Sequence, residues 1–180
     1  MDHKQFTERF CRFVLADRTG KLAAALQALG ADDGYYLYHG LIEPFDSSKP
    51  MPLGSPLGSG PRVINNLKVS NSYLQRRLEA MKALRVPRTA VVDEFESIAL
   101  EEFELARMMD LLACKRILIG RDIRAGRIVP AADLRRLSNE LRTMSYDFAR
   151  LWLVRNRPSR LRDNLAALRS TIAEADELAK

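Results

Sequence analysis

Long hydrophobic runs are absent from this sequence of 180 residues. No apolar stretch approaches the roughly 20 residues that a membrane-spanning helix needs, and the first residues contain no apolar signal-peptide core. Cysteine is scarce too, and with only Cys11 and Cys114 a disulfide-stapled scaffold is excluded. Both cysteines lie in apolar helical patterns, so we expect buried, reduced thiols. These absences predict a cytoplasmic protein without a membrane partner.

Histidine is equally rare, which limits the chemistry that the chain can support. His3 and His39 are the only two, and neither has the cysteine or carboxylate spacing of a metal site. Asp93 and Glu94 are adjacent carboxylates, but they precede an apolar helical pattern and are typical of an acidic helix start. We therefore predict no catalytic residue, no cofactor and no metal. Whether this chain alone is an enzyme stays open, and the favoured interpretation is that it is not catalytic by itself.

Charge is unevenly distributed along the chain. Lys and Arg outnumber Asp and Glu by 29 to 23, a net charge of +6, within an ordinary globular composition of 47% hydrophobic and 29% charged residues. Residues 93–104 carry only acidic charges, whereas residues 115–169 are rich in arginine. Two interpretations follow: the acidic stretch pairs internally with the basic one, or the basic half binds nucleic acid or another polyanion. Internal pairing is the favoured interpretation.

The first 39 residues are predicted to form an N-terminal helical hairpin. Phe6, Phe10, Phe13 and Val14 recur at helical spacing, and a second apolar pattern ends at Gly30. About 25 residues are too few to bury such a face internally. The hairpin is therefore expected to pack against a partner. The aromatic run 35–38 is predicted to form either a strand fragment or an aromatic plug for that face.

Residues 40–62 differ in kind, because they contain five of the eight prolines together with glycines and serines. Neither a helix nor a central strand propagates through such a run. We predict a long loop or linker here.

Residues 63–180 carry helical patterns throughout. One pattern opens at Ser70, a long one follows Asp93 and stops near Gly126, a third begins at Pro130, and the last follows Ser159. The sequence therefore predicts an all-α fold: an antiparallel bundle of about four helices, preceded by the short hairpin and the Gly/Pro/Ser loop.

The corner between the last two helices has the most distinctive composition. The single tryptophan, Trp152, lies among arginines where a helix meets a proline. Aromatic and basic side chains together are typical of nucleic-acid contacts. The favoured alternative is structural, with the indole facing the core and the arginines reaching carboxylates of the acidic helix. The candidate interaction or structural residues are Trp152, Arg155, Asn156, Arg157 and Arg160.

Four segments occur in an order that suggests a family. They are ADRTGKLAAALQALG (16–30) after an aromatic-rich helix, VSNSYLQRRL (69–78), EEFELARMMDLLACKR (101–116) and FARLWLVRNRPSRLRDNLAAL (148–168). In this order the chain resembles the C-terminal helical region of bacterial glycoside hydrolase family 20-type proteins, the β-N-acetylhexosaminidase class. The Trp helix running into Arg-Asn-Arg-Pro is the most specific of the four.

The resemblance implies an accessory role rather than a catalytic one. In that family the catalytic Asp-Glu pair lies in a (β/α) barrel, where the 2-acetamido group of the substrate attacks the anomeric carbon and the Glu protonates the leaving oxygen. This sequence has no barrel pattern, so no catalytic residue is carried over. The expected function is a helical accessory domain that packs on a barrel domain or a second subunit, with a homo-oligomer possible. The alternative is a basic module that binds nucleic acid or another polyanion.

Overall fold

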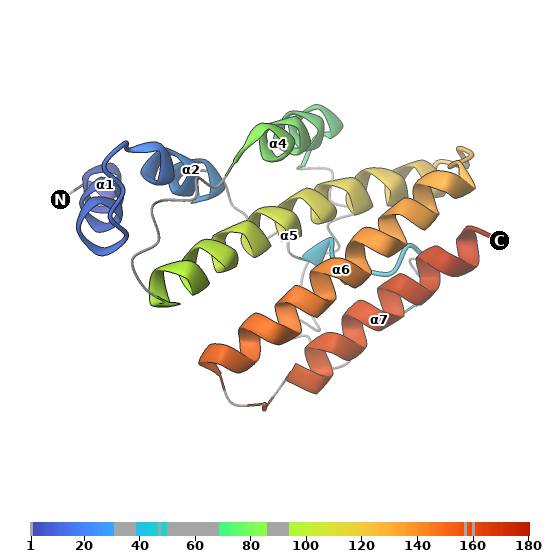
Figure 1. The fold of residues 1–180 in the computed structure, drawn as a ribbon. Coiled ribbons are helices and arrows are strands. Elements are labelled where there is room, and N and C mark those ends of the chain that lie inside the picture. Colours follow the sequence, from blue (N-terminus) through green and yellow to red (C-terminus); the bar gives the residue numbers. More distant parts are fainter. Residues whose placement is uncertain are drawn as a thin grey trace.

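The computed structural model describes residues 2–30, 39–46, 48–49, 69–85, 94–156, 158–159 and 161–180, with residues 95 and 96 described for their backbone only. Within these residues it contains six helices and no strand (Figure 1), which confirms the predicted all-α class. None of these helices is both long and apolar enough to cross a lipid bilayer. The helices are α1 His3–Val14, α2 Lys21–Gly30, α4 Asn71–Ala83, α5 Glu94–Arg124, α6 Ala131–Arg155 and α7 Leu161–Leu178.

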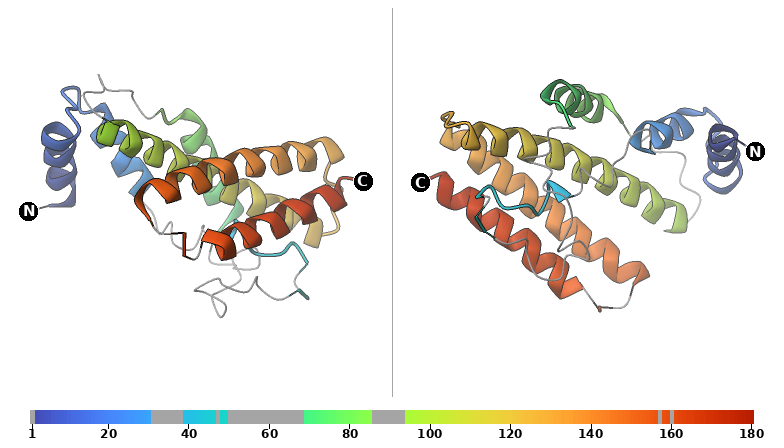
Figure 2. Two further views of the ribbon diagram at one scale, coloured as in Figure 1. Left: turned by 60° about the horizontal axis from the view of Figure 1, so that its bottom comes forward. Right: turned by 180° about the vertical axis from the view of Figure 1, so that it is seen from behind.

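Three long helices form the body of the molecule. α5, α6 and α7 run side by side, each antiparallel to the next, and α4 packs on α5 (Figures 1 and 2). The α1–α2 hairpin sits at the end where α5 begins, so the described N-terminal and C-terminal residues lie at opposite ends of the molecule. The predicted helical bundle is therefore present, with the hairpin attached at one end.

Local signals set the helix boundaries close to the predicted positions. The Ser70 side chain caps α4 by accepting a hydrogen bond of 3.1 Å from the Tyr73 amide. Beyond the end of α5, Gly126 adopts a φ of +71°, which a residue without a Cβ tolerates. α5 continues through Gly120 as one helix. Pro130 then precedes α6, where its missing N–H costs nothing.

The main core lies between α4, α5, α6 and α7. Its fully buried side chains come from all four helices and include Leu74, Met81, Leu112, Cys114, Ile117, Leu141 and Met144. A smaller cluster attaches the hairpin to the first turns of α5, through Cys11, Leu15, Leu22, Ala23, Ala99 and Leu100. Both cysteines are buried and unpaired, as expected.

The first part of the predicted linker is not a spacer. Residues 39–46 lie against the bundle, and Leu41 and Phe45 are almost fully buried in the main core. Around Pro44 the described backbone has turns and bends in place of a regular helix or strand, and a loop of this kind can still be buried. The aromatic run 35–38 and most of residues 47–68 lie outside the described residues.

A buried carboxylate organises the turn between α1 and α2. Asp17 accepts hydrogen bonds from the Leu22 and Ala23 amides, at 2.9 and 3.1 Å, and from the amide and hydroxyl of Thr19. Burial raises the pKa of Asp17, but these four hydrogen bonds outweigh burial and leave the pKa below its ordinary value of 3.8. The charged carboxylate therefore supplies acceptors for the first amides of α2.

We predict that Asp17→Asn lowers the free energy of unfolding by about 1–2 kcal/mol at pH 7, because a charged cap becomes a neutral one. The native pKa lies below that of the unfolded chain, so the stabilisation is complete above about pH 4 and is lost as the pH falls further. Urea unfolding of both proteins at pH 7, 5 and 3 measures this. A difference that is as large at pH 3 as at pH 7 contradicts the assignment.

Candidate functional site

The corner that follows α6 contains internal ion pairs. Arg155 Nε lies 2.6 Å from Glu102 Oε1, and Arg150 pairs with Glu101, so the end of α6 is tied to the acidic start of α5. Internal pairing, the interpretation favoured from the charge distribution, is therefore present at these two arginines. Asn156 ends the helix, its amide donating to the Trp152 carbonyl at 2.8 Å. Arg157 and Arg160 lie outside the described residues.

Trp152 is less buried than the helical period predicted. Leu141 and Met144 on the same row are buried, whereas Phe148 and Trp152 are both partly buried. The indole packs on the Phe148 ring with centroids 5.5 Å apart. The indole therefore lies on the side of α6 that the period indicates, although a period does not specify how far the neighbouring helices cover that side near the end of a bundle.

Partial burial sets the expected effect of removing the indole. Truncation of a fully buried aromatic residue costs about 3–5 kcal/mol, so we predict a loss of about 1–2 kcal/mol for Trp152→Ala. Arg155→Ala, which removes a surface ion pair, is expected to cost less than about 1 kcal/mol. Chemical denaturation measures the free energy of unfolding of both variants. A loss above about 3 kcal/mol for Trp152→Ala contradicts partial burial and indicates an indole that is fully buried in the core.

Most of the arginine excess is engaged within the fold. Several guanidinium groups pair with carboxylates, and some of them also donate to backbone carbonyls. On α4, Arg77 binds Asp110 and donates to the Ala28 and Leu29 carbonyls at the end of α2. Further described pairs are Lys82–Glu79, Arg107–Glu104, Lys115–Glu140, Arg116–Glu174, Arg124–Glu43, Arg127–Asp122, Arg136–Asp133, Arg142–Asp176 and Arg150–Asp147. The basic half therefore does not present its charge as one free patch.

Arg116 on α5 is the most deeply buried of these side chains, with no exposed surface. Its Nη1 donates to the Gly40 carbonyl at 3.0 Å and also to the Glu43 carbonyl, and its Nη2 lies 3.0 Å from Glu174 Oε2. The guanidinium lies 4.2 Å above the Phe45 ring. Burial lowers the pKa of Arg116 to about 10, which Glu174 and Glu43 oppose, so the group is charged at neutral pH.

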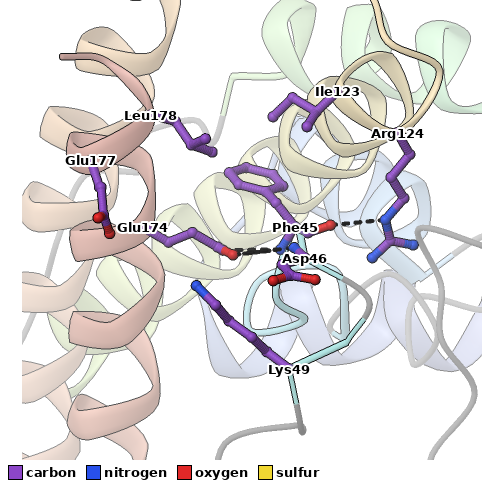
Figure 3. A pocket seen from close by; sticks show the side chains of 8 residues that line it. All are labelled: Phe45, Asp46, Lys49, Ile123, Arg124, Glu174, Glu177 and Leu178. Atoms are coloured by element: carbon purple, nitrogen blue, oxygen red, sulfur yellow. Dashed lines mark hydrogen bonds between the residues drawn. The ribbon is translucent and has the colours of Figure 1, made fainter.

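The same cluster holds the backbone of residues 40–46. The Glu174 carboxylate on α7 accepts from the Phe45 amide at 2.9 Å and from the Asp46 amide at 3.3 Å. Arg124 on α5 donates to the Phe45 carbonyl at 2.9 Å. Figure 3 shows both contacts at the edge of a hollow of about 510 Å³. Glu174 and Arg124 already hold this segment. The hollow therefore lies beside a structural cluster, here called the clamp, which consists of Arg116, Arg124, Glu174 and the backbone of residues 40–46.

Both cysteines and His39 are buried. Burial raises the pKa of Cys114 to about 12 and that of Cys11 to about 11, so neither thiol is a thiolate near neutral pH. Burial lowers the pKa of His39, against the opposing effect of Glu43. The described residues contain no group of three or more histidine, cysteine or carboxylate side chains able to hold a metal ion.

The buried clamp yields a stability prediction. Removing one partner of a buried ion pair leaves the other uncompensated, so we expect Arg116→Met to lower the free energy of unfolding by about 3–5 kcal/mol. Arg142→Met, which breaks an exposed pair with Asp176, is the matched control and is expected to cost less than about 1 kcal/mol. Urea unfolding measures both, and equal losses contradict a dominant role for the buried clamp.

The face of α1 formed by Phe6, Phe10, Phe13 and Val14, here called the phenylalanine face, is exposed. The exposed fractions of these residues are 54%, 37%, 78% and 44%. The Phe6 and Phe10 rings stack with centroids 6.2 Å apart. α1 packs on α2 through Cys11 and Leu15, a different side of the helix. The apolar face that predicted a partner is therefore not covered by any described part of the chain.

No family model, curated protein or solved structure matches this chain. The likeness to family 20 glycoside hydrolases consequently stays a prediction that rests on the four sequence segments.

Proposed function

We propose that this chain is a non-catalytic helical accessory domain that docks on a second protein through the phenylalanine face. The observation that carries the proposal is the exposure of three phenylalanines on one 12-residue helix. Contiguous exposed apolar surface on a folded domain is typical of an interaction site. Under the family resemblance, the partner is a barrel domain or a second subunit.

The placement of α1 supports this proposal. The hairpin projects at one end of the bundle, where α1 packs on α2 and contributes Cys11 and Leu15 to the small cluster at the start of α5 (Figures 1 and 2). The phenylalanine face is exposed and belongs to neither apolar cluster of the described residues. A partner can therefore cover this face without rearranging the bundle.

Site-specific photocrosslinking in the native host tests the docking. We expect p-benzoylphenylalanine at position 13 to form a discrete adduct with one protein, because Phe13 is the most exposed anchor of the face. The matched control carries the same group at Tyr146 on α6, which is also well exposed. Phe10→Glu is expected to abolish the adduct at position 13.

Three results contradict the proposal: no adduct at position 13, the same adducts at positions 13 and 146, or an adduct that Phe10→Glu leaves intact. Phe10→Glu places a charge on an exposed helix face, so the melting temperature is expected to change little. A normal melting temperature confirms that loss of the adduct is not loss of folding.

A turnover assay tests the non-catalytic part of the proposal. The purified chain is expected to release no product from a chromogenic N-acetylglucosaminide. Glu94, the described member of the adjacent carboxylate pair, is exposed at the start of α5 and lies outside any hydrogen bond or ion pair with described residues. Turnover that Glu94→Gln abolishes contradicts the proposal.

A further inference from the structure

The anchors on α1 have the spacing of a helix that binds in a groove. Phe6, Phe10 and Phe13 stand at positions i, i+4 and i+7, which lie on one side of a helix. Helices that lay an apolar face into a groove on a partner present anchors at this spacing. A groove encloses such a row more completely than a flat surface does.

The exposed area also favours a groove over a second copy of α1. From the exposed fractions of the four side chains, the phenylalanine face offers roughly 400 Å². Stable interfaces bury about 800 Å² on each partner. Two α1 helices laid face to face thus fall short of a stable dimer, whereas a groove gains further area by covering the flanks of the helix.

Four cations of the hairpin have no carboxylate partner among the described residues. Residues 2–30 contain five basic side chains against three acidic ones, and one of the acids, Asp17, is the buried cap of α2. On α5, Glu101, Glu102 and Glu104 are paired with arginines of the bundle, and Glu94 is exposed. The basic side chains Lys4, Arg12, Arg18 and Lys21 form no ion pair with any described residue.

One of these cations stands beside an anchor. The Arg12 guanidinium lies 5.9 Å from the centre of the Phe13 ring. A groove that receives Phe13 therefore meets Arg12 at its rim, and a carboxylate there is the complementary group.

Resting on the proposed function, we infer that the phenylalanine face binds an apolar groove with an acidic rim on the partner protein. The groove takes the three rings, and its carboxylates face Arg12 and the other cations of the hairpin. An anionic lipid surface shares the charge and is an alternative outcome of the test, whereas the i, i+4, i+7 row of three anchors favours a groove on a protein.

Charge reversal in the crosslinking protein tests this inference. With p-benzoylphenylalanine at position 13, the double substitution Lys4→Glu and Arg12→Glu is expected to reduce the yield of the protein adduct about tenfold. The matched control is Arg162→Glu with Arg169→Glu on α7, two exposed arginines outside any described ion pair. This control changes the net charge equally and is expected to reduce the yield less than twofold.

The outcomes separate this inference from the proposed function. A protein adduct that survives both double substitutions equally overturns the acidic rim and leaves the docking intact. The absence of any protein adduct in the parent overturns both. An adduct with lipid, or with a second copy of the chain, also overturns the acidic groove. Circular dichroism of each variant verifies that α1 is still helical.

Discussion

The buried guanidinium of Arg116 is the contact on which the arrangement of the bundle depends. It joins α5 to the Glu174 carboxylate of α7 and to the backbone of residues 40–43. A charge without exposed surface is costly unless it is compensated. Nη1 and Nη2 are paired, while Nε has no hydrogen-bond partner, so the charge depends on segment 39–46 and on α7 for its compensation. The ring of Phe45, held under the guanidinium, extends the same clamp into the apolar core.

The same use of arginine explains the composition of the chain. Arg77 and Arg107, like Arg116, donate to backbone carbonyls at helix or loop ends, at Ala28 and Met81 respectively. These side chains satisfy acceptors that helix ends leave open. Much of the positive charge is therefore structural, and the hairpin differs because Lys4, Arg12, Arg18 and Lys21 form no ion pair with a described residue and the phenylalanine face is not covered by any described part of the chain.

Periodic features were predictable from the sequence, and contacts between distant segments were not. The exposed row of Phe6, Phe10 and Phe13 and the boundaries of α4 and α6 follow from helical spacing and capping residues. The burial of Arg116 depends on carbonyls some 75 residues away in sequence, which no local pattern encodes. The degree to which Trp152 is buried was not predictable for a related reason. How much of a side chain is covered depends on where the neighbouring helices end.

Fluorine NMR with fluorophenylalanine labels and a soluble paramagnetic gadolinium chelate tests most directly whether α1 exposes its aromatic face. Solvent relaxation of each ring reports its exposure in the isolated protein. The account predicts strong relaxation for Phe6 and Phe13, less for Phe10, and almost none for Phe45, which is buried under Arg116. If the Phe6 and Phe13 rings are as protected as Phe45, the chain covers this face itself and the docking surface does not exist.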